Sequence, residues 1–366
     1  MSPEESSPTG TNGNGDDHLL LLNVANQTGV LSDALSKPSY LGVGMRSFSV
    51  IETENPRTAW ITLQMNPCTE KTLSRIKALI GTIVTIGQRN VHDLHHHPGV
   101  QVRQHVRMRV DCFNVRAQKN IAALVEQYGG RLEVFHTQSH IALTAHPHDI
   151  ARFKSDIRTA SPEHVISRTN PPIANFFDLE REIGESNENR KAPPDTNYVG
   201  EWKDRHIVVV TLARAKTSLG NVEALLDKVS SRGKNIATAS QVDVDPHTNI
   251  VRLTLHIQGC DERKIDQVIA QIRKEPAVIK ADLVRDSLTT QHAIVRLTNC
   301  TDVETAKASI RENGKIVFSI ENDVLGKITG TPKIIAQQLN TLNQQGDLRF
   351  GRFAPIAQLE GGKSGL

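Results

Sequence analysis

The sequence predicts an α+β protein that contains two copies of one two-domain unit. The chain has 366 residues, enough for about two or three domains of ordinary size. Its patterns of strands, turns and helices recur in the second half in the order in which they appear in the first. Within each half the first six patterns read β-α-β-β-α-β.

The internal repeat is visible at four histidines that begin strand-like segments. HLLLLNVANQTGVLSDALS starts at His18 and HIVVVTLARAKTSLGNVEALLDKVS starts at His206. HVRMRVDCFNV and HAIVRLTNCTDV start in the same way at His105 and His292. The spacing within a half is 105 − 18 = 87 positions in the first and 292 − 206 = 86 in the second. A duplicated unit is therefore the economical interpretation.

The first domain of the first copy is expected to be a ferredoxin-like unit, an antiparallel sheet with both helices on one face. Alternating apolar residues indicate the strands, and apolar residues three and four apart indicate the helices. The predicted elements are strand 18–25, helix 29–37, strand 43–51, strand 58–65, helix 69–80 and strand 82–87.

The second copy repeats this order with clearer helices. The apolar face of the helix that begins at 220 contains Val222, Leu225, Leu226 and Val229. The predicted elements are strand 206–213, helix 220–232, strand 235–244, strand 249–257, helix 261–274 and strand 277–284.

A smaller α+β domain is expected after each ferredoxin-like domain. In the first copy a helix over 120–130 ends on two glycines and a second helix lies near 148–158; the second copy repeats the pattern. The polar start of the chain is predicted to be a disordered tail, and two polar segments are predicted to be linkers, the second of them mobile. The expected division is tail 1–17, domain 18–90, His-rich linker 91–104, domain 105–174, linker 175–203, domain 204–286 and domain 290–362.

Composition excludes several classes of protein. The net charge is only +3 on 43 basic and 40 acidic residues, so no nucleic-acid partner is expected. The longest apolar runs, such as 19–22, are the length of strands, and no membrane-spanning segment is expected. The first residues lack a signal or transit peptide, which favours a cytoplasmic protein.

Two regions resemble a known family. HIVVVTLARAKTSLGNVEALLDKVSSRGKNIATASQV, with ERKIDQVIAQIRKEPAVIKADLV after it, resembles the ACT domain of the acetolactate synthase (acetohydroxyacid synthase) regulatory small subunit. KIVFSIENDVLGKITGTPKIIAQQL, with GRFAPIAQLEGG at its end, resembles the C-terminal domain of the same subunit. The resemblance covers roughly 18–173 and 204–362, and it implies the two-copy form of that subunit.

The resemblance also implies a binding site. In that family, ACT domains pair edge to edge and hold a branched-chain amino acid between a loop N-x-x-G-x-L and the asparagine of a turn R-G-x-N. The first copy keeps the loop but has Gly44 in the turn, whereas the second copy keeps the turn and has threonine at the start of its loop. The implied ligand-binding residues are Asn26, Gly29, Val30, Leu31, Thr217, Gly220, Asn221, Val222, Asn235 and Ile236.

These residue types suit a free amino acid. Backbone N–H groups at a helix N-terminus favour a carboxylate, and a glycine there lets the backbone approach closely. An asparagine side chain can accept from the ammonium group and donate to the carboxylate. One methylene changes binding by only about 1–3 kcal/mol, so valine, leucine and isoleucine all remain candidates.

Each copy lacks one of the two motif asparagines and keeps the other, which suggests a composite site. If the two ACT domains of one chain pair, Asn26 and Gly29 would face Asn235 in one complete site. Thr217 and Gly220 would face Gly44 in an impaired one. The alternative is that both copies have drifted.

The resemblance implies a regulatory subunit that is not itself an enzyme. Its partner would be the catalytic large subunit, which holds thiamine diphosphate, magnesium and FAD, with no cofactor in this chain. Self-association through ACT domains is also expected.

Two alternatives remain: a stand-alone amino-acid sensor that controls another enzyme, and a metal-dependent enzyme built on His92, His95, His96 and His97. A solvated linker is the favoured interpretation of those histidines.

Overall fold

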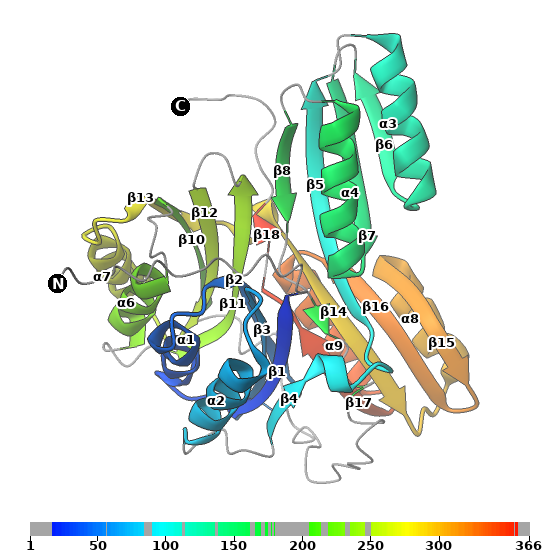
Figure 1. Cartoon of the computed structure of the whole chain (residues 1–366). Coiled ribbons are helices and arrows are strands. Elements are labelled where there is room, and N and C mark those ends of the chain that lie inside the picture. Colours follow the sequence, from blue (N-terminus) through cyan, green and yellow to red (C-terminus); the bar gives the residue numbers. More distant parts are fainter. Residues whose placement is uncertain are drawn as a thin grey trace, which may run out of the picture.

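The structure is a computed structural model, and it has the mixed α+β architecture with antiparallel sheets that the sequence predicts (Figure 1). It describes residues 17–55, 57–83, 90–111, 114–135, 138–161, 165–169, 173–174, 177, 179, 205–213, 219–230, 235–245, 250–354 and 356–357.

Unit 1a, residues 18–93, has the element order β-α-β-β-α-β. Hydrogen bonding places its strands in the order β4-β1-β3-β2, all antiparallel. The elements are β1 His18–Ala25, α1 Val30–Tyr40, β2 Met45–Thr53, β3 Thr58–Met65, α2 Glu70–Gly81 and β4 Val91–Asp93.

The closing strand of unit 1a corrects the sequence prediction. We expected it at 82–87, but Thr82 and Ile83 form a turn and 84–87 lie outside the described residues. Strand β4 pairs with β1 instead, with Asp93 opposite Leu20. Asp93 is only 3% exposed, and Lys77 of α2 lies 3.5 Å from its carboxylate.

The His-rich segment 91–104 is therefore not simply a solvated linker. After β4 it forms the short 3-10 helix η2, Leu94–His96, whose N-terminus is capped by the Asp93 carboxylate. Leu94 and Val100 are buried in an apolar cluster, while the side chains of His95 and His96 are exposed. No group of three metal-ligating side chains occurs among the described residues.

Unit 2a, residues 205–284, repeats the order of unit 1a with its strands arranged β13-β10-β12-β11. The repeated histidines have the same structural role in both copies. The ring of His18 donates to the carbonyl of Cys68, and that of His206 donates to the carbonyl of Cys260. The elements are β10 Arg205–Ala213, α6 Leu219–Ser230, β11 Asn235–Asp245, β12 Ile250–Gln258, α7 Glu262–Ile272 and β13 Val278–Val284.

Unit 1b, residues 102–174, shows more regularity than the sequence indicated. It too reads β-α-β-β-α-β, with strand order β6-β7-β5-β8 and a short added strand β9 beside β5. The elements are β5 Val102–Asp111, α3 Val115–Gln127, β6 Arg131–Phe135, β7 Gln138–Ala145, α4 Pro147–Ala160, β8 Val165–Thr169 and β9 Ile173–Ala174.

Unit 2b, residues 289–357, has the equivalent elements in the equivalent order, β15-β16-β14-β17, with β18 beside β14. A short 3-10 helix, η5 Asp286–Leu288, precedes it. The elements are β14 Thr289–Thr298, α8 Val303–Asn313, β15 Gly314–Ile320, β16 Asp323–Gly330, α9 Pro332–Asn343, β17 Asp347–Arg352 and β18 Ile356–Ala357.

Units 1a and 2a pair edge to edge within the chain. Strand β2 pairs antiparallel with β11, with Val50 opposite Ala239 and Ser49 opposite Ser240. Helices α1 and α6 lie side by side (Figure 1), where Ser32 donates a hydrogen bond of 2.5 Å to Asp227. One apolar core runs through both units.

The b units attach across the copies. Strand β17 of unit 2b pairs with the end of β2 in unit 1a, whereas β8 of unit 1b meets β11 of unit 2a. An apolar cluster lies between units 1a and 2b. Its buried members include Leu19, Leu21, Ile51, Trp60, Leu325 and Phe353.

The predicted tail and linker lie mostly outside the described residues. Asp17, the last residue of that tail, forms an ion pair of 3.0 Å with Arg46. Phe177 and Leu179, near the start of the 175–203 segment, are buried in the apolar cluster between units 1a and 2b. That part of the segment is packed. Within the described ranges no helix has the length and apolar content that a membrane span requires.

Candidate functional site

A pocket lies at the N-terminus of α1, where unit 1a meets unit 2a. Most of its wall comes from the end of β1, the loop after it and the start of α1, with further contributions from β2 and β3. Ile236 of β11 reaches it from the other copy. The lining residues are Val24, Ala25, Asn26, Gln27, Thr28, Gly29, Val30, Leu31, Val50, Ala59, Ile61 and Ile236.

Gly29 sets the geometry of the loop. It is the N-cap residue of α1 and has φ +91°, in the left-handed region that favours glycine. A Cβ at this position would meet nothing within 4 Å, so there is room for a side chain. Glycine is favoured here because of the backbone conformation. Among the described residues no side chain caps α1, and the N-terminus of this helix presents backbone donors of the kind that bind anions.

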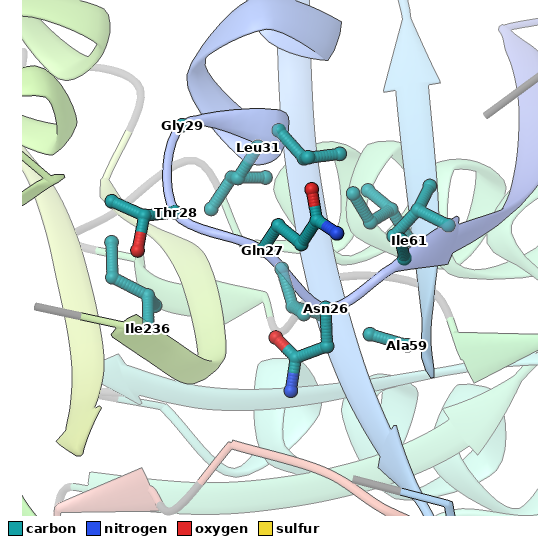
Figure 2. Close-up of a pocket in the computed structure, with 12 residues that line it drawn as sticks. Asn26, Gln27, Thr28, Gly29, Leu31, Ala59, Ile61 and Ile236 are labelled. Atoms are coloured by element: carbon teal, nitrogen blue, oxygen red, sulfur yellow. The ribbon is translucent and has the colours of Figure 1, made fainter. Parts of the chain in front are cut away.

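The side chains around the loop are neutral and mostly apolar. In Figure 2 Ile236 lies next to Thr28, while the side chain of Gln27 extends toward Leu31 and Ile61. Asn26 points the other way, and its backbone N–H donates to the carbonyl of Arg57 at 2.7 Å. A neutral pocket with polar groups at a helix N-terminus suits a small molecule with an anionic end and a short apolar side chain.

The pocket is narrow in this structure. Its cavity volume is about 20 Å³, which is room for about one water molecule. A free branched-chain amino acid is several times larger. Its binding therefore requires Gln27 to move or the walls to separate.

The structure brings together half of the residues that the sequence pointed to. Asn26, Gly29, Val30, Leu31 and Ile236 line one pocket, although they come from both copies.

The remaining candidates lie elsewhere or beyond the described side chains. Asn235 is the first residue of β11, next to Ile236, and its backbone pairs with Gln258. Val222 is buried in the core on α6, the helix that also contains Gly220 and Asn221. Thr217, and the side chains of Asn221 and Asn235, lie outside the described part of the structure. The opposite half-site is therefore still a prediction.

The structure explains why the first copy has glycine at position 44, where the turn motif has asparagine. A Cβ on Gly44 would lie 2.5 Å from the side-chain nitrogen of Asn66. Asn66 donates its backbone N–H to the carbonyl of Gly44 at 2.8 Å and accepts from Arg46 at 3.1 Å. The first copy has thus filled this corner with Asn66.

Sequence reasoning missed several lining residues. Gln27 and Thr28 are two of the three variable positions of the loop motif, so the motif alone gave them no role. Val50, Ala59 and Ile61 belong to strands β2 and β3 and read as ordinary core residues. Alternation along the strands could not show which core positions reach the loop.

Comparison with known proteins identifies no family. No family model and no curated protein matches the chain. Among solved structures it is similar to an acetolactate synthase small subunit from Thermotoga maritima, with 20% identity, a TM-score of 0.35, and coverage of 43% of this chain and 95% of that one. It is also similar to an aspartate kinase from Synechocystis, with 10% identity, a TM-score of 0.25, and coverage of 90% of this chain and 54% of that one. Scores this low support no inference about function.

Proposed function

We propose that this chain is an amino-acid-responsive regulatory protein that binds its effector between units 1a and 2a. The observation that carries the proposal is the pairing of β2 with β11, which puts Ile236 of one copy into the pocket formed by the loop of the other. Units 1a and 2a would then be paired, ferredoxin-like ACT domains, and the loop at α1 would hold the effector carboxylate.

The specific function we propose is that of the regulatory small subunit of acetolactate synthase. In this role the chain activates the catalytic large subunit and makes it sensitive to valine, leucine or isoleucine. The thiamine diphosphate, magnesium and FAD of the reaction belong to the catalytic partner. Support comes from the sequence motifs at 206–242 and 262–284, from the neutral pocket, and from the four units arranged in two copies.

Reconstitution with the catalytic subunit tests this proposal. The isolated chain is expected to form no acetolactate from pyruvate, and the mixture is expected to turn over faster than the catalytic subunit alone. Added valine, leucine or isoleucine should reduce that rate. Acetolactate formation by the isolated chain would contradict the regulatory role. Amino-acid binding without any activation would favour a stand-alone sensor that controls another enzyme.

Three substitutions test the composite site. Gly29→Asp should abolish effector binding, because it forces an unfavourable backbone conformation and puts a carboxylate near that of the ligand. Asn235→Ala should weaken binding by removing a polar partner, and Thr217→Ala should have less effect. Calorimetry with each of the three amino acids would measure this. Equal losses from all three substitutions would leave no support for a composite site.

A further inference from the structure

Glu52 is a buried carboxylate at the junction of three units. It lies on β2 of unit 1a, two residues after Val50 of the pocket wall. Arg205 of unit 2a donates two hydrogen bonds to it, at 2.8 and 2.7 Å. Arg352 of unit 2b donates two more, at 3.1 and 2.6 Å. The side chains of the three residues are at most 3% exposed.

The Glu52 carboxylate is charged at neutral pH. Burial by itself raises the pKa of Glu52, but the guanidinium groups of Arg205 and Arg352 outweigh it and hold the pKa well below its usual range. Charge-assisted, paired hydrogen bonds of this kind are among the strongest in proteins. The three units are therefore held together firmly at this point.

Strand β2 is attached to unit 2b at further points. Glu54 lies 3.3 Å from Arg349 of β17 and accepts the backbone N–H of Phe350. The backbones also pair, with Glu52 opposite Arg352 and Thr53 opposite Gly351. A displacement of β2 at Val50 is thus transmitted to β17 through both side chains and backbone.

The second copy lacks the arginine. The turn of each copy places Gly44 and Asn235 in equivalent positions, so Asp243 is the counterpart of Glu52. Asp243 is opposite Thr169 of β8, just as Glu52 is opposite Arg352 of β17. A threonine cannot supply the charge and paired donors that an arginine provides.

We propose that Glu52 couples the effector pocket to unit 2b. The inference rests on the proposed function, because it takes the pocket to be the effector site. The cavity of about 20 Å³ must widen to admit an amino acid, and Val50 and Ile236 are walls that can separate. Because β2 is attached to unit 2b through Arg352, Arg349 and backbone pairing, its displacement moves unit 2b with it. Compactly packed units move as rigid bodies in response to such shifts, because their cores do not deform continuously.

Hydrogen–deuterium exchange on the full chain, with calorimetry to confirm binding, tests the coupling. Saturating valine, leucine or isoleucine should change exchange at the pocket loop 26–31 and also at β17, with a smaller change at β8. Glu52→Gln keeps the shape but removes the charge, and it should reduce the response of β17 while the loop still responds. Asp243→Asn, the matched control, should leave the response of β17 intact.

The outcomes separate the two proposals. If none of the three amino acids binds the wild-type chain, the proposed function fails and this inference fails with it. If an amino acid binds and protects the loop but β17 does not respond, only the coupling is overturned. Arg352→Gln serves as a second variant, because it leaves the pair between Arg205 and Glu52 in place. An undiminished response of β17 in that variant would also overturn the coupling.

Discussion

Units 1b and 2b have the same elements in the same order, yet their equivalent sheet positions face different surroundings. Leu325 and Ile294 of unit 2b belong to the apolar cluster against unit 1a. The equivalent residues of unit 1b are His140 and Arg107, and both are exposed. The shared backbone topology therefore does not determine which surface an α+β unit buries. The side chains at a few alternating strand positions do.

The largest expected effect comes from the ion pairs that hold unit 2b. Glu52→Ala should lower the free energy of unfolding by about 3–5 kcal/mol, since it leaves two arginines buried without their carboxylate. The counterpart Asp243→Ala should cost less, because Thr169 stands opposite it where Arg352 stands opposite Glu52. Urea denaturation of both variants measures the difference. Equal losses would show that the two copies are held alike.

The second largest effect is expected at the apolar cluster between units 1a and 2b. Leu325→Ala should cost about 2–4 kcal/mol, because it leaves a cavity between units 1a and 2b. His140→Ala at the equivalent exposed position should change stability by no more than about 0.5 kcal/mol. Thermal and urea denaturation of the two variants provide the test. A loss at His140 as large as that at Leu325 would mean that unit 1b also buries this face.

A third prediction concerns a feature that the copies share. His105 and His292 each bond to a threonine, Thr144 and Thr329, at 2.9 Å. The pKa of His105 is lowered to about 4, mainly by burial and then by the positive charges of Arg107 and Lys327. The pKa of His292 is lowered to about 3, again mainly by burial and then by the positive charge of Lys327. The unfolded chain thus binds more protons below pH 6.5, so stability should fall as pH drops from 6.5 toward 3.

The melting temperature measured between pH 7 and 4 tests this prediction. Replacing both histidines with glutamine should flatten the pH dependence, and a single replacement should flatten it by part of that amount. A double variant with an unchanged slope would assign the acid sensitivity to other groups.

The smallest expected effect is at Glu54. Burial raises the pKa of its carboxyl, with Arg349 opposing the shift. The stability that accompanies a raised pKa is present at low pH and is lost as pH rises through the folded value. The neutral variant Glu54→Gln should therefore cost less than about 1 kcal/mol at pH 7, or stabilise slightly. A loss comparable to that of Glu52→Ala would contradict this ranking of the two carboxylates.

The sequence predicted the fold well where periodicity was strong. Strands 18–25 and 58–65 were predicted with the bounds that the structure has, and most helices to within about three residues. Helix α3 is the exception, because it begins at Val115, five residues before the predicted start. The closing strand of unit 1a was misplaced. The apolar stretch after residue 82 has stronger strand propensity than Val91–Asp93, yet Val91–Asp93 is the segment that pairs with β1 beside Leu20–Leu22.

The candidate site was only partly predictable. The loop motif pointed to Asn26 and Gly29, and the repeat pointed to a partner from the other copy. The sequence did not indicate the ion pairs of Glu52, because Arg205 and Arg352 lie 153 and 300 positions away in the chain. Glu52 was expected to lie beyond the strand that ended at 51, and only the extension of β2 to Thr53 makes it part of the sheet.

The crossed attachment of the b units explains how the copies could diverge. A homodimer of one a–b half would repeat every substitution at both of its symmetry-related junctions. Here β17 meets β2 and β8 meets β11 within a single polypeptide, so each junction is encoded separately. Position 352 can be arginine while position 169 is threonine, and Gly44 can differ from Asn235. Fusion of the two halves thus allows one junction to be rigid and its counterpart to differ, a division of labour that strict twofold symmetry forbids.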